Sequence, residues 1–473
     1  MRFLKNTNIF FYIFFTLLAF YLRFYLLEDR NSWHDEWHSV YVSDPSIPLR
    51  GTFARYLGNK GDSFLTEYYP ILYLLILKYF FSLFGYFDDN GRILSLIFGF
   101  MCVPLSMFIS QYYLKNKQLL LVGILASCNL FLIWQSLEIR AHSILVFSCL
   151  TSIVLFYEVL KSNKFFINLV YCIFSIFTLS LWPISGAIFF GKFIYLIQLH
   201  FLKKEKPNHI YCMFLIIPII YLFLNIDYLI LNTGRDFHYT SLYKSFFYNY
   251  HFRTFFSSVW LGAIFLLLFS FIILKKFKVI FLQSSPENLL YFIIFSSYIL
   301  TLSYTLIRGA AVMSPKYVIF IVPLICIVIS NFIYQNNYRL FLSLSTVSVV
   351  LINLYLNYFY WPIDRPDIKS MLQAISKSSD RALVSKETDV FNNYLKTKKL
   401  FHKHEFILFK KVSLIPNHTN GFWTVCLNHP RFAVGENKKN EIDPKCIWEN
   451  MENYNSVKTI NIPDLIFTHY KKK

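Results

Sequence analysis

The stretch NSWHDEWHSV, residues 31–40, contains four side chains that can bind a metal or move a proton: His34, Asp35, Glu36 and His38. Histidines at positions i and i+4 share one side of a helix, as in zinc hydrolases with a His-Glu-x-x-His motif. Here the first histidine is followed by Asp35 rather than the longer Glu, and Pro45 and Pro48 soon interrupt the helix. Two adjacent acids also repel unless a cation, a proton or a reacting group needs them. The motif is therefore either a zinc site or, as we favour, an acid pair in an active site.

Further ionisable side chains stand beside apolar segments: Glu67, Glu138, Arg140, Arg308 and Lys316. Such groups are expensive near a membrane, so their gathering on one face predicts a site. A carboxylate can take the proton of an attacking hydroxyl, while cations neutralise a departing phosphate. This combination suits the transfer of a sugar from a lipid-linked phosphate donor. A divalent cation held by Asp35 and Glu138 is a possible aid to that reaction.

The elements that must position these residues are membrane helices. Of the 473 residues, 56% are hydrophobic and 15% are charged, and the mean hydropathy is +0.44. Between residues 8 and 361, apolar runs of roughly 18 to 22 residues recur, each long enough to span a bilayer as a helix. We expect an all-α polytopic membrane protein with about eleven transmembrane helices. The net charge of +19 lies mostly in loops and in the tail, where it contacts membrane lipids. No compact basic motif indicates a nucleic-acid partner.

Basic loops predict the orientation of these helices. The loops KSNK (161–164), KKEK (203–206) and KKFK (275–278) are two helices apart and belong on the cytoplasmic side. The loop 29–68 and the tail then lie outside the cytoplasm, most simply across a bacterial inner membrane. For this orientation to hold, one of the runs 69–87, 93–113 and 118–136 must fail to cross fully, or two short ones must share a crossing.

The chain divides into a membrane-spanning catalytic domain, residues 1–362, and a small soluble C-terminal domain, residues 363–473. The segment DRPDIKSMLQAISKSSDRALVSKE predicts an amphipathic helix, a short strand at RALVS and then another helix, so the tail is expected to be α/β. If the tail lies outside the cytoplasm, Cys426 and Cys446 can form a disulfide.

Several motifs in order resemble the GT-C superfamily of polytopic glycosyltransferases, within the branch of protein O-mannosyltransferases and aminoarabinose (lipid A) transferases. WHDEW looks like the Asp-Glu motif of that family's first outer loop. The stretches EYYPILYLLILKYFFSLFG and GRILSLIFGF resemble the next two conserved blocks. SLEIRAHSILVF is similar to its Glu-Ala-Arg-x-Tyr segment, and SPKYVIFIVPL to its Arg-Tyr helix.

The resemblance implies a GT-C-like fold and a polyprenyl-phosphate-linked sugar as donor, transferred with inversion. By this analogy Asp35 is the catalytic base, and Glu36 and Glu138 shape the acceptor or a cation site. It also implies that Arg140 and Lys316 hold the donor phosphate.

We add Arg308 to the predicted phosphate site, and Glu67 and His34 to the acceptor or cation site. The chain departs from the family pattern in three places: Tyr69-Pro70-Ile71 replaces His-Pro-Pro, His142 replaces Tyr, and Lys316 replaces Arg. Lysine keeps the charge but loses the bidentate fork of arginine.

Two other classes stay open at this point. A transporter or flippase of lipid-linked sugars would place charges at mid-helix depth, where Lys192 is the main example. A membrane zinc hydrolase would need a third ligand, which the spacing does not offer. The sequence leaves the sugar open, and the acceptor could be an envelope glycan, a lipid or a protein.

Overall fold

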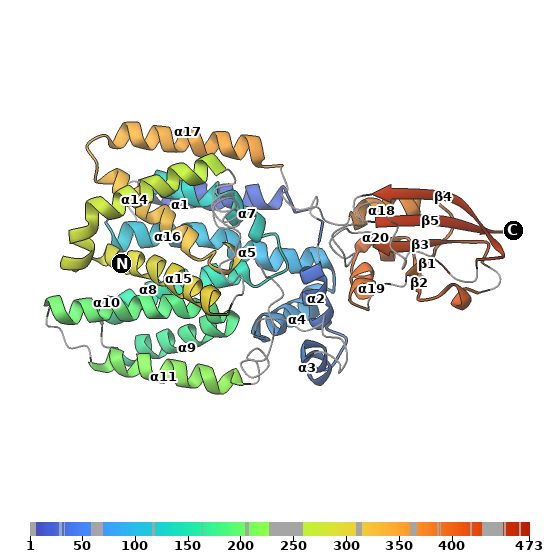
Figure 1. Cartoon of the computed structure of the whole chain (residues 1–473), viewed down its shortest axis with the longest axis horizontal. Coiled ribbons are helices and arrows are strands. Elements are labelled where there is room, and N and C mark those ends of the chain that lie inside the picture. The colour runs from blue at the N-terminus through green and yellow to red at the C-terminus, as the bar shows by residue number, and fades with distance from the viewer. Residues whose placement is uncertain are drawn as a thin grey trace. The chain divides into compact units, whose positions relative to one another are not determined.

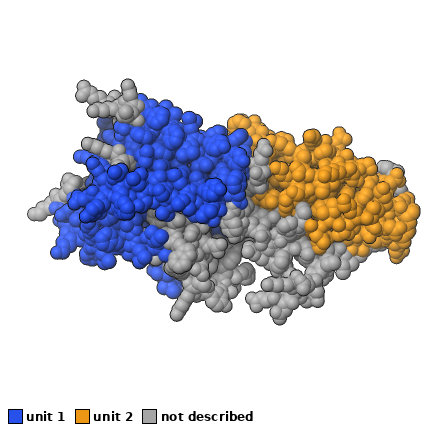
Figure 2. Space-filling view, turned by 90° about the horizontal axis from the view of Figure 1, so that it is seen from above, with its two compact units in different colours: residues 1–27, 68–73, 92–360 blue, residues 28–67, 74–91, 361–473 orange. Residues whose placement is uncertain are grey.

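The computed structural model describes most of the 473-residue chain. The described residues are 6–27, 31–32, 34–57, 70–115, 119–162, 164–203, 208–226, 259–308, 315–359, 367–385, 387, 389–416, 419–427, 448, 451–462 and 465–473. They belong to two compact units, shown in Figure 2. Unit 1 contains residues 1–27, 68–73 and 92–360, and unit 2 contains residues 28–67, 74–91 and 361–473.

Unit 1 is built from helices (Figure 1). They are α1 (Asn6–Phe24), α5 (Asp88–Phe108), η1 (Ile109–Tyr113), α6 (Leu119–Ser127), α7 (Leu130–Gln135), α8 (His142–Lys161), α9 (Phe165–Leu181), η2 (Pro183–Ser185), α10 (Gly186–Lys203), α11 (Asn208–Leu224), α14 (Val259–Leu282), α15 (Pro286–Arg308), η4 (Pro315–Tyr317), α16 (Ile321–Tyr334) and α17 (Arg339–Asn357). Apolar runs form helices because lipid offers the backbone no hydrogen-bond partner, and a helix satisfies its own peptide groups.

Within the described residues, five helical segments are long and apolar enough to cross a membrane: Asp88–Tyr113, His142–Lys161, Pro183–Leu202, Pro286–Ile307 and Arg339–Asn357. Four shorter apolar helices accompany them: Asn8–Phe24, Leu72–Phe84, Phe165–Leu181 and Ile321–Tyr334. The predicted class, an all-α multi-pass membrane protein with a small α/β domain, is confirmed. The count of about eleven crossings remains a prediction.

The three runs between residues 69 and 136 differ in length. The first forms α4 (Leu72–Phe84), whose 13 residues reach only about 20 Å. The third is divided into α6 and α7 at Asn129, whose side-chain oxygen accepts a hydrogen bond from the Leu132 amide at 2.9 Å. Since a bilayer core is about 30 Å thick, neither α4 nor α6 reaches across it by itself, and which run does not cross remains a prediction.

Unit 2 combines three helices from the first third of the chain with the C-terminal domain (Figure 1). Its elements are α2 (His34–Val42), α3 (Leu49–Leu57), α4, α18 (Ile368–Ser376), β1 (Ala382–Ser385), α19 (Asp389–Lys396), α20 (Lys399–Lys403), β2 (Ile407–Phe409), η5 (Val412–Leu414), β3 (Gly421–Leu427), β4 (Tyr454–Ile462) and β5 (Leu465–Lys472). The helix, strand and helix expected at the start of the tail are therefore present as α18, β1 and α19.

The strands form one mixed sheet in the order β2-β1-β3-β5-β4. β1 pairs in parallel with β2 and β3, while β5 pairs antiparallel with β3 and β4. The apolar strand GFWTVCL is almost wholly buried because it lies at the centre of this sheet. Cys426 on this strand is disulfide-bonded, and its expected partner, Cys446, lies outside the described residues.

Candidate functional site

The acid pair lies at the first turn of α2 in unit 2. Asp35 is half-buried and Glu36 is fully buried. The helix ends at Val42, before Pro45, as the sequence predicts. Acids in a first turn are stabilised by the positive end of the helix dipole. Asp35 is thus an accessible carboxylate on a helix whose other side chains are mostly buried.

The C-terminal domain packs directly on this helix. The ring of Trp37 is 1% exposed, and its centroid lies 5.1 Å from that of Phe391 and 5.8 Å from that of Tyr394, both on α19. Trp37 is therefore enclosed by aromatic side chains of the tail and does not anchor at the membrane interface. The helix that carries Asp35 is therefore held by the tail.

A polar network reinforces this packing. The hydroxyl of Tyr394 donates to Asp88 Oδ2 at 2.8 Å and makes a short hydrogen bond with the hydroxyl of Ser32. Lys398 Nζ lies 2.6 Å from the same carboxylate oxygen of Asp88. Since Asp88 is only 2% exposed, its charge needs these donors. Ser32 directly precedes the acid motif, so the network fixes the entry to α2.

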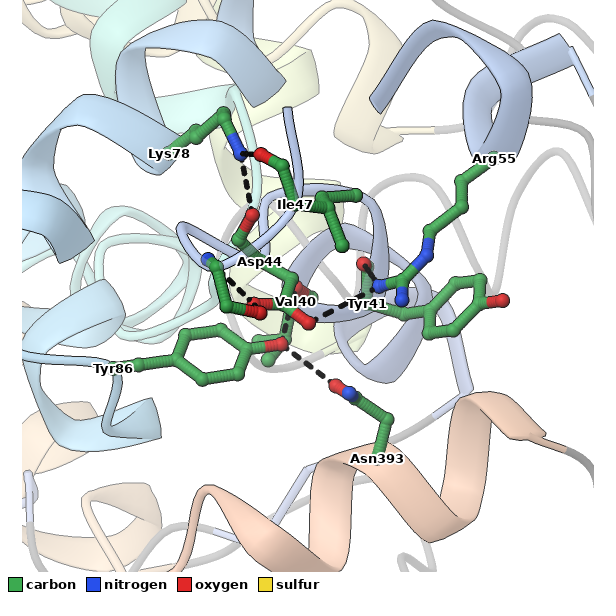
Figure 3. Close-up of polar contacts among 9 residues, drawn as sticks. Val40, Tyr41, Asp44, Ile47, Arg55, Lys78, Tyr86 and Asn393 are labelled. Atoms are coloured by element: carbon green, nitrogen blue, oxygen red, sulfur yellow. Dashed lines mark hydrogen bonds and ion pairs between the residues drawn. The ribbon is translucent and has the colours of Figure 1, made fainter. Parts of the chain in front are cut away.

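The segment that follows α2 is also fixed by side chains (Figure 3). Lys78 Nζ on α4 donates to the carbonyl oxygens of Asp44 at 2.5 Å and Ile47 at 2.6 Å. Arg55 Nη1 on α3 donates to the carbonyl oxygen of Tyr41 at 2.6 Å and lies 3.3 Å from Asp44 Oδ2. The Lys78 ammonium and the Arg55 guanidinium each bind two acceptors. These bonds hold together the end of α2, the turn that follows it and α3.

A tyrosine links the same helix to the tail. Tyr86 Oη lies 2.9 Å from the carbonyl oxygen of Val40 and 2.6 Å from Asn393 Oδ1 (Figure 3). Val40 is on α2 and Asn393 is on α19. Both ends of α2 are therefore tied to α19 by polar contacts as well as by aromatic packing.

The second group of predicted residues lies in unit 1, in the turn between α7 and α8. Glu138 is 2% exposed and Arg140 is 5% exposed. Arg92 Nη1 on α5 donates to the carbonyl oxygen of Leu137 at 2.9 Å, and Ser95 Oγ lies 3.5 Å from the carbonyl oxygen of Arg140. The turn is irregular, so its backbone needs such donors to be buried. The start of α5 thereby positions Glu138 and Arg140.

Gly99 allows α5 to approach this turn closely. A Cβ atom at Gly99 would lie 2.2 Å from Ser136 Cβ and 3.3 Å from Arg23 Nε. Arg23, near the end of α1, is 1% exposed and donates to the carbonyl oxygen of Ala19 at 3.0 Å. The ends of α1 and α7 therefore meet α5 at a position where only glycine fits.

Aromatic rings connect the turn to Lys316. The His142 ring lies 6.3 Å from the Trp182 ring, which in turn lies 5.1 Å from the Tyr317 ring. Lys316 Nζ lies 5.4 Å from the centroid of Tyr317, within range of a cation–π contact. A series of ring contacts thus runs from His142, which follows the turn, to the residue next to Lys316.

Other predicted residues are not placed in this way. Glu67 lies outside the described residues. His34 begins α2 and Arg308 ends α15, but the described structure does not include their side chains. Asp35 and Glu36 belong to unit 2, whereas Glu138, Arg140 and Lys316 belong to unit 1. Within the described part of the chain, no three His, Cys, Asp or Glu side chains gather as metal ligands.

Sequence reasoning assigned no role to four residues that support these two groups: Arg23, Arg92, Trp182 and Tyr394. Arg23 and Arg92 had a signal, since an arginine in an apolar run needs a partner or a function. Trp182 is followed by Pro183 between two apolar runs, which marks a turn. Tyr394 had no local signal, because its partners are more than 300 residues away.

The helices of unit 1 and the small mixed sheet of unit 2 form a fold that agrees with the resemblance seen in the motifs. The chain is similar in structure to ArnT from Cupriavidus metallidurans, both bound to undecaprenyl phosphate and in the apo state. For the bound form the TM-score is 0.55 at 11% identity, covering 98% of each chain. For the apo form the TM-score is 0.55 at 11% identity, and the match covers 97% of each chain. No family model and no curated protein matches the sequence.

Proposed function

We propose that this protein is an integral-membrane glycosyltransferase that moves a sugar from a polyprenyl-phosphate donor to a hydroxyl acceptor. The observation that carries the proposal is the fold, shared over 98% of the chain with ArnT bound to undecaprenyl phosphate. Two features of this chain agree with such a donor. The accessible acid Asp35 lies on a firmly held helix. Unit 1 carries the cations Arg140 and Lys316, next to residues that are linked by ring contacts.

In the proposed reaction the acceptor hydroxyl attacks the anomeric carbon of the sugar as the bond to the phosphate breaks. Asp35 takes the proton of the hydroxyl, and the polyprenyl phosphate leaves with the bonding electron pair from the opposite face. Arg140 and Lys316, joined by Arg308, neutralise the departing phosphate. Attack opposite the leaving group inverts the anomeric configuration.

The remaining predicted residues serve the acceptor side. Glu36, Glu138, Glu67 and His34 would shape the acceptor site or, with Asp35, hold a divalent cation. Carboxylate oxygens suit such a cation, which would raise the reactivity of the bound groups by its charge. We place the reaction on the extracytoplasmic face of a bacterial inner membrane, where a lipid-linked donor replaces the soluble nucleotide sugars of the cytoplasm.

The test is transfer of radiolabelled sugar from polyprenyl phosphate to endogenous acceptors in membranes that contain the full chain. Asp35→Asn should lower the rate by about 10²- to 10⁴-fold, the usual contribution of a general base. Asp89→Asn is the matched control, since Asp89 is half-buried like Asp35 and pairs only with the exposed residue Lys399 among the described side chains. Full activity of Asp35→Asn would show that the proposed mechanism is wrong. Mass spectrometry of envelope glycans with and without the gene would identify the acceptor.

A further inference from the structure

Unit 2 contains a polar cleft of about 250 Å³ whose lining does not include Asp35 or Glu36. Its walls come from α2, α3, α19 and the region of β2. The residues that line it are Tyr41, Arg55, Asp389, Asn392, Asn393, Lys396, Leu408 and Lys410. Only Leu408 is aliphatic, so the cleft suits a polar ligand of about the size of one sugar ring with an anionic group.

The charges of the lining favour an anion. Three cations (Arg55, Lys396 and Lys410) and one carboxylate (Asp389) leave a net charge of +2. Asp44, behind the lining, lies 3.3 Å from Arg55 and offsets part of that charge. Lys410 Nζ lies 2.6 Å from Asp389 Oδ1, but both side chains are more than 60% exposed. Such a pair is weak in water and can open for a ligand.

The cleft also offers hydrogen-bond groups that the protein does not use. Asn392 is 5% exposed, and its Nδ2 donates to the carbonyl oxygen of Glu387 at 3.0 Å. Its buried Oδ1 has no hydrogen-bond partner among the described residues. Arg55 uses Nη1 for its contacts with Tyr41 and Asp44, and Figure 3 shows the rest of its guanidinium beside the Tyr41 ring. A buried amide oxygen without a partner is costly, so it indicates a donor supplied by a ligand.

We propose that this cleft binds an anionic sugar, a ring that bears a phosphate or a carboxylate, as part of the acceptor glycan. A bare anion would need donors only. The acceptor atoms Asn392 Oδ1 and the Asp389 carboxylate call for ligand hydroxyls, while Arg55, Lys396 and Lys410 supply the countercharge. The Tyr41 ring, whose centroid lies 4.0 Å from Arg55 Cζ, holds the guanidinium beside the cleft.

The cleft and the proposed base share α2, and this part of the inference rests on the proposed function. Asp35 and Tyr41 are six residues apart, which corresponds to about 9 Å along the helix axis. An acceptor bound in the cleft would therefore have to extend along α2 to bring a hydroxyl to Asp35. The cleft would select the acceptor, and Asp35 would activate it.

The direct test is binding of glucose 6-phosphate to the full chain in detergent, measured by saturation-transfer NMR or calorimetry. We expect the double variant Lys396→Ala/Lys410→Ala to bind at least about tenfold more weakly, because it loses two charged donors. Lys403→Ala is the matched control, since this exposed lysine of α20 does not line the cleft. Binding should also weaken as the salt concentration rises.

Glucose and inorganic phosphate, used as separate probes, test the two halves of the proposed ligand. Both should bind more weakly than glucose 6-phosphate. Inorganic phosphate binding as tightly as the sugar phosphate would reduce the cleft to a simple anion site and overturn the inference. No binding of glucose 6-phosphate, or equal binding by the double variant, would overturn it as well.

Transfer assays separate this inference from the proposed function. The double variant should raise the KM for the acceptor and leave the KM for the donor unchanged. If Asp35→Asn abolishes transfer while the double variant keeps the parental acceptor KM, the inference fails and the proposed function stands. If Asp35→Asn transfers normally, the proposed function fails, and the binding result still decides whether the cleft holds an anionic sugar.

Discussion

The contact between α2 and α19 makes a quantitative prediction for Tyr394→Phe. The substitution removes one hydroxyl, which donates to Asp88 Oδ2 at 2.8 Å and bonds to Ser32. It keeps the ring that packs on Trp37, whose centroid is 5.8 Å away. A hydrogen bond to a charged group contributes about 1.5–3 kcal/mol. We expect the lower end, about 1.5 kcal/mol, because Lys398 remains 2.6 Å from the Asp88 carboxylate.

A loss of about 1.5 kcal/mol raises the population of an opened α2 roughly tenfold. Hydrogen–deuterium exchange of the purified full chain in detergent measures this directly. Amides in peptides covering residues 31–42 should exchange about tenfold faster, while helices of unit 1 exchange as in the parent. In the transfer assay kcat should fall while the donor KM is unchanged, since the base is misplaced for more of the time.

Tyr79→Phe is the control, because Tyr79 is 57% exposed on α4 in the same unit. It should leave exchange and transfer unchanged. Unaltered exchange of α2 in Tyr394→Phe would refute the reasoning that the tail holds this helix through Tyr394. A uniform increase over both units would indicate general destabilisation instead, and would refute it equally.

Two further predictions concern the turn in unit 1 and the glycine beside it. Gly99→Ala would place a Cβ 2.2 Å from Ser136 Cβ, so we expect a loss of about 1–3 kcal/mol by overpacking, seen as lower thermal stability of the purified protein. Gly51→Ala on α3 is the control: its nearest neighbours are at 3.5 Å, and a stability equal to or above the parent is expected from helix propensity. Equal stability of the two variants would contradict the packing argument. Arg92→Met removes the 2.9 Å hydrogen bond to the carbonyl oxygen of Leu137. We expect the KM for the donor in the transfer assay to rise about tenfold or more. An unchanged donor KM would exclude a role for this bond in positioning the turn.

The division into units bears on how the tail contributes. The sequence suggests a membrane domain, residues 1–362, followed by a separate tail, residues 363–473. In the structure one compact unit joins residues 361–473 with 28–67 and 74–91. Since α19 packs on the helix that carries Asp35, we propose that the tail is a working part of the catalytic apparatus. The tyrosine and cleft variants described above test this proposal.

Much of the architecture follows from local sequence. Long apolar runs form helices because a membrane leaves the backbone no other way to satisfy its hydrogen bonds. The tail's first helix and strand follow from periodicity, which is also local. The helix His34–Val42 and its end before Pro45 are set by residues within one or two turns.

Contacts across hundreds of residues could not be predicted in this way. The sequence does not show whether the Trp37 ring lies at the membrane interface or inside the protein, because lipid headgroups and protein side chains can both bury an aromatic ring. Its contact with the Phe391 ring, far away in the sequence, decides between the two. The sequence likewise gives no role for Asp88. In the folded chain its carboxylate binds the Tyr394 hydroxyl and the Lys398 ammonium. The residue types suited to sugar transfer were already evident in the sequence. The tertiary structure decided which distant side chains hold them in place, since the free energy of burial depends on partners that only folding brings together.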